Sequence, residues 1–274
     1  MNTNSNLYTV VYSTIIVVVV AAILAFAAMS LNGRQVDNIK AETIGQILSA
    51  AQLECNGSNA EIIASYKDQI AEAYTVDLTG AKTGTLDIES AEIYTTSDLK
   101  AQNYNIAGGE GASLPVYVFK NGTKVVPVYG AGLWGPVWGY IAVGTDGKIA
   151  GATFDHSSET PGLGGKIKDD PSFRAQFAGK AFDFSDTTPF AIVKGGAPAG
   201  KANAIDAITG ATMTSKGLSA AINTWAQAYA PVLAAAPASC CGEGECCCGG
   251  EAAEGECCGE AAEGAEGETT KTEE

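Results

Sequence analysis

The stretch from Val10 to Leu31 has no charged side chain, and this long apolar run constrains the fold more than any other feature. Its twenty-two residues would form a helix of about 33 Å, long enough to cross the hydrocarbon core of a membrane. A cleaved signal peptide is the alternative, because Ala25-Phe26-Ala27 resembles a cleavage site. Residues 1–9 contain no Lys or Arg, however, and the run exceeds the usual length of a signal-peptide core. We therefore predict an uncleaved anchor over about residues 10–31, within an N-terminal region of residues 1–32.

The charges beside this span give only a weak sign of its orientation. Arg34 and Lys40 follow the span, which favours a cytoplasmic C-terminal side by the positive-inside rule. Asp37 and Glu42 lie among them, and large downstream domains can be translocated regardless of such charges. The residues alone therefore leave the side of the membrane open.

The remaining composition is that of a globular domain followed by an acidic tail. The 274 residues are 46% hydrophobic and 17% charged, which allows a sizeable core besides the anchor. Of the net charge of −15, residues 240–274 contribute −10 through eleven Glu and one Lys, which leaves −5 for the rest. A chain without a basic face is not expected to bind nucleic acid.

Helices are predicted after the anchor. Apolar residues recur at near-helical spacing over residues 36–53, so a helix either continues or follows the membrane span, with a stripe of Ile39, Ile44, Ile47 and Leu48. Residues 55–59 break this pattern, and Asn59 is a candidate N-cap for a second helix over residues 60–74. We assign residues 33–79 to a helical spacer and scaffold, distinct from a main domain over residues 80–235.

Residues 80–155 are interpreted as strands and turns of an antiparallel sheet. Two β-rich runs, 114–120 and 124–129, flank Asn121-Gly122, which is a strong hairpin signal. A second hairpin is predicted between 139–143 and 148–154. With a short helix from Asp170-Pro171, a strand over 190–194 and a helix after Thr212, the expected fold class is α+β, with helices flanking the sheet.

The loop predicted between the two hairpins, residues 130–139, has an unusual composition. It holds four glycines, Pro136 and two tryptophans, Trp134 and Trp138. The glycines could let the backbone approach a flat ligand on which the tryptophans stack. Alternatively, the tryptophans fill the core beneath a glycine-rich loop. The residues themselves leave both interpretations open.

Two polar segments complete the candidate site. His156 and Glu159 could form an acid–base pair, cap each other or lie in solvent. Residues 206–215 contain three threonines, a serine and Gly210, and are typical of a polar turn that leads into a helix. The sequence shows no Ser-His-Asp, Cys-His or metal-ligand triad, so no complete catalytic site is expected in this chain.

Three motifs together resemble a known family. The pattern D-x-I-T-G-A-T-x-T-S over residues 206–215 resembles the flavinylation motif of NqrC, a component of the sodium-translocating NADH:quinone oxidoreductase. The sequence G-A-G-L-W over residues 130–134 resembles the family's G-x-G-L-W segment. His156 and residues 159–164 resemble its H-x-x-E-T-P-G-L-G segment. The resemblance covers roughly residues 1–235 and implies the fold of an FMN-binding domain.

In that family, the threonine that follows Gly-Ala carries FMN through a phosphoester bond, and this position is Thr212 here. The resemblance therefore implies a covalently attached FMN, with its phosphate near a helix N-terminus. It also implies further cofactor contacts from the three motifs, namely Asp206, Thr209, Gly210, Ala211, Thr214, Ser215, Glu159, Thr160, Pro161, Gly162, Leu163, Gly164, Gly132, Leu133 and Trp134.

The resemblance implies an electron-relay component of a membrane complex that oxidises NADH, reduces quinone and exports sodium. Its expected partners are the other subunits, membrane lipid and a flavin transferase for maturation. Its FMN domain is expected on the periplasmic side of the bacterial inner membrane. Two alternatives remain: a flavoprotein like RnfG of the Rnf-type complex, and a membrane-anchored binding protein without a redox role.

The tail, residues 236–274, lies outside the resemblance. It is acidic and glycine-rich and has few large apolar residues, so it is predicted to be disordered. Adjacent cysteine pairs differ from the C-x-x-C spacing of common metal sites, so no metal is predicted there. A soft-metal tail is the alternative, with thiolates from Cys240, Cys241, Cys246, Cys247, Cys248, Cys257 and Cys258.

Overall fold

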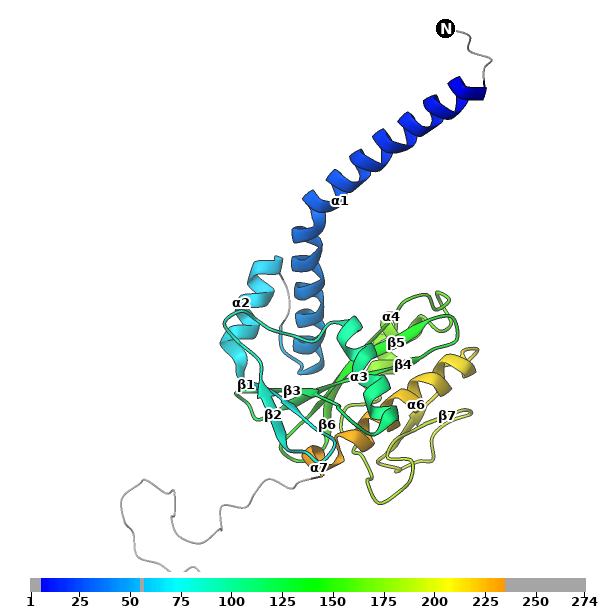
Figure 1. The fold of residues 1–274 in the computed structure, drawn as a ribbon. Coiled ribbons are helices and arrows are strands. Elements are labelled where there is room, and N and C mark those ends of the chain that lie inside the picture. Colours follow the sequence, from blue (N-terminus) through cyan, green and yellow to red (C-terminus); the bar gives the residue numbers. More distant parts are fainter. Residues whose placement is uncertain (1–5, 55–56, 235–274) are drawn as a thin grey trace, which may run out of the picture. The chain divides into compact units, whose positions relative to one another are not determined.

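The computed structural model describes residues 6–54 and 57–234, and Figure 1 shows helices arranged around an antiparallel sheet. The sheet has six strands in the order β2-β1-β3-β4-β5-β6, and each neighbouring pair is antiparallel. The strands are β1 (Ile70–Val76), β2 (Lys82–Thr85), β3 (Leu114–Phe119), β4 (Lys124–Ala131), β5 (Pro136–Val143) and β6 (Ile149–His156). The predicted α+β class with an antiparallel sheet is confirmed.

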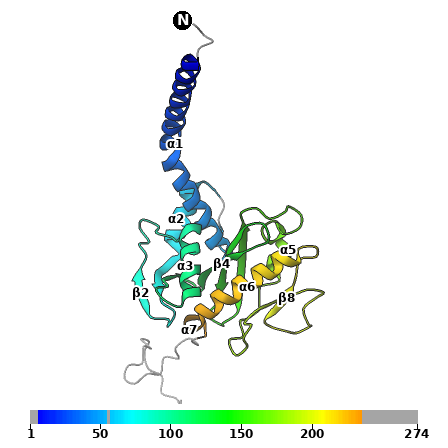
Figure 2. The ribbon, with the colours of Figure 1, turned by 45° about the vertical axis from the view of Figure 1, so that its right-hand side comes forward.

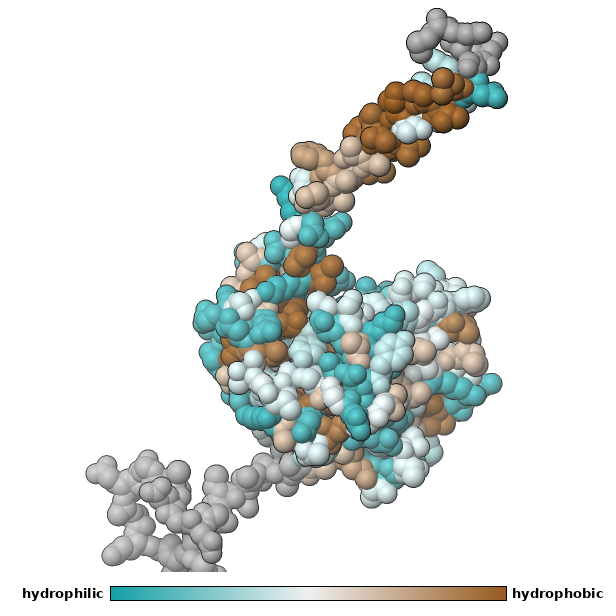
Figure 3. Space-filling model, in the orientation of Figure 1, coloured by the Kyte–Doolittle hydropathy of each residue, from teal (hydrophilic) through white to brown (hydrophobic). Residues whose placement is uncertain are grey.

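The predicted membrane span is the first part of one long helix, α1 (Asn6–Ala50). Its most apolar window has a mean hydropathy of 2.8 and is entirely exposed, so the helix is long and apolar enough to cross a membrane. Figure 3 shows this part as a hydrophobic surface. From Ala41 onward the same helix becomes buried in the domain. The helix predicted after the span therefore continues it without a break.

Helices cover both faces of the sheet (Figures 1 and 2). The buried end of α1, together with α2 (Asn59–Gln69), packs on one face, where Ile44, Ile47 and Leu48 join a core with Tyr117 and Tyr140. The other face carries α3 (Thr96–Gly108) and α6 (Thr212–Ala228), and its core includes Val126, Val128, Leu218, Ile222 and Trp225. Successive strand residues point to opposite faces, so each strand contributes to both cores.

One helix prediction is wrong at its C-terminal end. The helix expected over residues 60–74 ends at Gln69, and the chain continues as β1. β1 pairs with β2 on one side and β3 on the other. Ile70, Tyr74 and Val76 are good strand formers, and pairing on both sides outweighs the local helical spacing. The sheet thus includes a strand that precedes the domain boundary predicted at residue 80.

The interpretation of residues 80–155 as strands and turns alone is also wrong, because α3 lies within this segment. The helix begins after Thr95, whose N–H and hydroxyl both donate to Asp98 Oδ2, at 2.8 and 2.7 Å. It ends at Gly109, which adopts the left-handed conformation with φ 74°. The Thr95-x-x-Asp98 pair is a capping signal that the sequence contains.

Both predicted hairpins are present, but the glycine loop between them is shorter than expected. β4 extends to Ala131 and β5 begins at Pro136, and these two residues are paired. The loop therefore consists of residues 132–135, and Trp138 lies on β5 rather than in a loop.

The C-terminal part closes the domain around α6. It contains the expected short helix and strand, and it adds a parallel strand that the sequence did not indicate. The elements are α4 (Lys166–Asp169), α5 (Pro171–Ala175), β7 (Ala191–Val193), β8 (Ala204–Asp206) and α7 (Ala230–Leu233). The predicted cysteine tail lies outside the described residues.

Close packing of α6 on the sheet depends on Gly217. A Cβ atom at this position would overlap the carbonyl oxygen of Ala131 on β4. We expect Gly217→Ala to destabilise the protein by about 1–3 kcal/mol through overpacking, although alanine favours a helix. Gly45→Ala, at a helical position with open space around it, should be neutral or stabilising by about 0.5–1 kcal/mol. Thermal unfolding of the full chain in detergent measures both changes, and equal effects would contradict this packing argument.

Candidate functional site

Glu159 joins the three segments that the sequence singled out. Its side chain is 4% exposed and lies between the loop of residues 132–135 and the first turn of α6. Carboxylate Oε1 accepts a hydrogen bond from the Trp134 N–H at 2.8 Å, and Oε2 accepts one from the Thr214 hydroxyl at 2.6 Å. Segments more than fifty residues apart in the chain therefore meet at one carboxylate.

These hydrogen bonds decide the charge of Glu159. Burial alone would raise the pKa of its carboxyl group, but the hydrogen bond from Thr214 outweighs burial and the N–H groups of Trp134, Leu133 and Gly135 lower the pKa further. The group is therefore an acceptor at neutral pH. Of the alternatives for His156, the structure shows a cap, because its Nδ1 accepts from the Glu159 N–H at 3.2 Å.

Glycines make room for this carboxylate. A Cβ atom at Gly132 would lie 2.5 Å from Glu159 Oε1, and one at Gly164 would overlap Oε2. A Cβ atom at Gly135 would overlap the Ser158 hydroxyl, which donates to the Trp134 carbonyl at 3.1 Å. The close approach that these glycines allow is thus between segments of the chain itself, and not the approach of a flat ligand that their number suggested.

The turn before α6 places Thr212 at the first position of that helix. Gly210 takes the left-handed conformation with φ 83°, and buried Ser215 accepts from the Ile208 N–H at 3.2 Å, which closes the turn. Ala211 precedes the helix and has no side chain that could cap it. The half-buried Thr212 therefore lies where the helix presents free N–H groups and the positive end of its dipole.

Asp206 is engaged at some distance along the chain from this turn. Its Oδ1 accepts from the Ala197 N–H at 2.6 Å, and its own N–H donates to Gln176 Oε1 at 2.9 Å. The carboxylate thereby fixes the loop of residues 194–200 beside β8. This structural task was not foreseen from the motif.

Four large apolar side chains are exposed on the three segments, and we call them the apolar rim. They are Leu133, Trp134, Leu163 and Met213, with Trp134 67% and Met213 57% exposed. Leu163 lies against the turn before α6, because a Cβ atom at Gly210 would be 3.0 Å from its Cδ2. Exposure of Trp134 rules out the alternative in which this tryptophan fills the core. Trp138 is half-buried and packs against the α6-side core.

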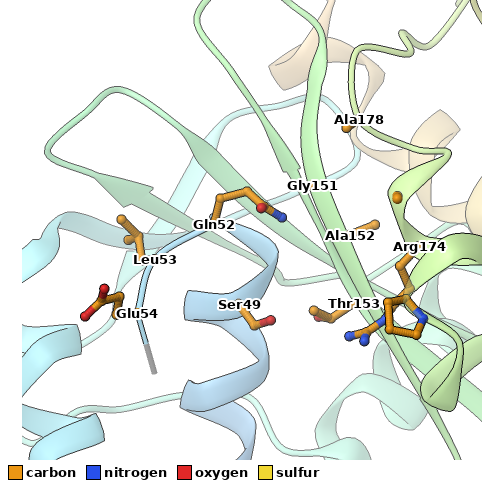
Figure 4. A pocket seen from close by; sticks show the side chains of 11 residues that line it. Ser49, Gln52, Leu53, Glu54, Gly151, Ala152, Thr153, Arg174 and Ala178 are labelled. Atoms are coloured by element: carbon orange, nitrogen blue, oxygen red, sulfur yellow. The ribbon is translucent and has the colours of Figure 1, made fainter. Parts of the chain in front are cut away.

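A separate pocket of about 470 Å³ lies between the end of α1, β6 and α5 (Figure 4). Ser49, Gln52, Gly151 and Arg174 are among its lining residues, and the predicted flavin residues are not. Arg174 Nε is buried there without a hydrogen-bond partner among the described residues.

Comparison with known proteins places the site in a family. A family model described as an FMN-binding domain matches residues 132–227, which includes all three segments. NqrC of the Na(+)-translocating NADH-quinone reductase from Vibrio anguillarum is 33% identical over 235 residues, covering 79% of this chain and 89% of that protein. The chain belongs to this NqrC family. The NqrC protein of Pasteurella multocida is 34% identical over 228 residues, with coverage of 77% and 87%.

Solved structures of NqrC proteins agree with the fold described above. The crystal structure from Parabacteroides distasonis has a TM-score of 0.62 and 32% identity, covering 74% of this chain and 96% of that one. NqrC of Shewanella oneidensis gives 0.59 and 25%, covering 72% and 97%. The resemblance drawn from the three motifs is confirmed at the level of NqrC. The rival interpretation, a flavoprotein like RnfG, is not the name that these relatives carry.

Sequence reasoning missed one buried ion pair beside this site. Asp155 is 3% exposed on β6, and its Oδ2 lies 2.8 Å from Lys168 Nζ. Lys168 was interpreted as a surface charge or an anion contact. The hydrogen bond to Asp155 raises the pKa of Lys168, against the effect of burial. Strand alternation was the signal: Thr153 and Asp155 share one face of β6, and a buried carboxylate requires a partner.

Glu159→Gln tests whether this carboxylate holds the site together. Both oxygens accept hydrogen bonds, so the amide nitrogen of glutamine would face a donor, and we expect a loss of about 1–3 kcal/mol in unfolding free energy at neutral pH. Because the folded-state pKa is lowered, the contribution is full above the ordinary glutamate pKa of about 4.3 and is lost as pH falls through the folded value.

The measurement is thermal or denaturant unfolding of parent and variant across that pH range. Exposed Glu89 provides the control, and Glu89→Gln should change little at any pH. A Glu159→Gln variant as stable as Glu89→Gln at neutral pH would contradict the role given to Glu159.

Proposed function

We propose that this NqrC-family chain carries FMN covalently on Thr212 and relays electrons within a sodium-translocating NADH:quinone reductase complex. The observation that carries the proposal is the convergence of the three motif segments at the uncapped start of α6, where Thr212 is the first residue. Membership of the NqrC family supports the same assignment. The complex named for the relatives acts on NADH, quinone and sodium.

The residues present at this point fit the two ends of FMN. A phosphate on the Thr212 hydroxyl would lie at the positive end of the α6 dipole, where the first N–H groups of a helix have no intrahelical acceptor. The apolar rim offers exposed surface for the flavin ring on the same segments. Bound FMN supplies the redox chemistry, and the protein supplies position and surroundings.

Within this proposal the chain's residues have distinct tasks. Thr212 holds the cofactor, while Leu163, Met213 and Trp134 contact its ring. The turn of residues 160–164 and Gly132 and Leu133 form the adjacent backbone, and Thr209 to Ala211 form the turn that presents Thr212. Glu159, Thr214 and Ser215 are buried and fix these segments, and Asp206 fixes the loop of residues 194–200.

We further propose that α1 anchors the chain in the bacterial inner membrane, with residues 1–32 holding the span, residues 33–79 the scaffold and residues 80–235 the FMN domain. Other subunits of the complex are the electron-transfer partners. A separate flavin transferase is the proposed source of the modification. The described residues hold one candidate span, so sodium transport is a task for the assembled complex.

Thr212→Ala should abolish covalent flavin. The parent chain, purified from a host that flavinylates its proteins, should show a mass increment of one FMN less one water on the peptide containing Thr212, and visible absorbance after denaturation. Thr209→Ala removes an exposed hydroxyl from the same turn and should retain the increment. An increment that persists in Thr212→Ala would contradict the assignment, as would a parent chain without any increment.

The domain that follows α1 should be accessible from outside the cytoplasm. We expect protease added to intact spheroplasts to digest it, because large domains are translocated despite a few basic residues such as Arg34 and Lys40. Immunoblotting of the chain, with a cytoplasmic protein as the control for lysis, measures this. Digestion only after lysis would place the domain on the cytoplasmic side.

A further inference from the structure

A buried carboxylate links the anchor helix to the loop that forms the flavin site. Asp155 Oδ2 accepts from Gln46 Nε2 on α1 at 2.9 Å and from Lys168 Nζ on α4 at 2.8 Å. Its other oxygen, Oδ1, accepts from the His156 N–H at 2.7 Å. One side chain thus contacts the anchor helix, a helix of the site's border and the last residue of β6.

This contact differs from the rest of the interface between α1 and the sheet. The surrounding contacts are apolar, from Ile44, Ile47 and Leu48. Apolar side chains tolerate small rotations and shifts of a helix, whereas hydrogen bonds have narrow limits of distance and angle. Gln46 makes two such bonds to β6, because its carbonyl also accepts from the Thr153 hydroxyl at 3.0 Å. The polar contacts therefore define the rotation and height of α1 on this strand.

Stability alone is a poor explanation for a buried ion pair here. Removing two charges from water costs several kcal/mol per ion, and apolar replacements of similar size are often as stable. What such a group contributes best is a single arrangement of the elements it joins. At Asp155 those elements are the membrane helix and the start of the loop of residues 157–165.

The hydrogen bonds continue from this carboxylate to the flavin site. The His156 ring accepts from the Glu159 N–H, and the Glu159 carboxylate binds the hydroxyl of Thr214, two residues after Thr212. The sequence of contacts is therefore α1, Asp155, His156, Glu159 and the first turn of α6. Each step is a hydrogen bond between described residues.

We propose that Asp155 is a positioning residue that couples the orientation of the membrane helix, through Gln46, to the surroundings of the flavin on Thr212. This rests on the proposed function, since it needs a flavin at that position. The covalent attachment itself does not depend on Asp155 in this proposal. Asp155 instead sets how the loop of residues 157–165 lies against the bound cofactor.

The test compares full-length, flavin-loaded variants in detergent or in the assembled complex. Asp155→Asn keeps the volume but replaces an acceptor oxygen by a donor amide, which faces a donor whichever way it is turned. Gln46→Leu keeps the helix packing and removes its donor. Glu72→Gln is the matched control, because it removes the exposed ion pair with Lys82 on β1.

We expect both test variants to retain one covalent FMN per chain, to alter the visible circular dichroism of the flavin, and to shift its reduction potential. The shift corresponds to a roughly threefold or larger change in the ratio of oxidised to reduced flavin at fixed potential. The double variant should shift less than the sum of the single variants, because both changes break the same link. Glu72→Gln should match the parent.

Flavin spectra and potential that match the parent in Asp155→Asn and Gln46→Leu, with only a lower melting temperature, would overturn this inference and leave Asp155 a structural residue. If Asp155→Asn does not fold, Lys168→Met decides the matter, since Lys168 is half-exposed and its loss leaves Asp155 bonded to Gln46 and His156. A smaller change in the same flavin bands is then expected, and none would overturn the proposal. Absence of covalent FMN from the parent would instead refute the proposed function.

Discussion

The geometry of the candidate site depends on one buried carboxylate. Glu159 accepts hydrogen bonds from the Trp134 N–H and the Thr214 hydroxyl, and so it holds two loops and a helix start in fixed relation. Its neighbours Gly132 and Gly164 have no side chains because the carboxylate occupies that space. A buried charge without such donors would be costly, so the motif must keep the acceptor, the donors and the glycines together. The conspicuous composition of the motifs follows from this packing as well as from any cofactor.

The second organising feature is the double use of α1. Its first part is exposed and apolar, as a membrane span requires, while the part from Ala41 onward forms a layer of the domain core. A flexible linker would let the domain move freely relative to the bilayer, whereas a continuous helix packed on the sheet limits that movement. An electron carrier gains from such a limit, because transfer between subunits requires reproducible distances. The polar contacts of Gln46 with β6 lie on this packed part.

Much of the architecture follows from local patterns in the sequence. The uncharged run of residues 10–31 and the Asn121-Gly122 turn specify their structures almost alone, since each depends on a few neighbouring residues. The errors arose where distant contacts decide. Residues 70–76 have helical spacing but pair with two strands, and the cap at Thr95 was overlooked. For the site, the motifs correctly indicated which segments belong together, whereas the pairing of Asp155 with Gln46 and Lys168 depends on elements far apart in sequence. Local patterns cannot indicate such a pair beyond the demand for some partner.

The central claim is that the three segments converge in order to hold FMN on Thr212. A high-resolution structure of the flavin-loaded chain, purified from a flavinylating host, tests it most directly. The account predicts density continuous from the Thr212 hydroxyl oxygen into the FMN phosphate at the start of α6, with the flavin ring against Leu163 and Met213. Density for FMN on another residue, or a ring turned away from the apolar rim, would contradict it.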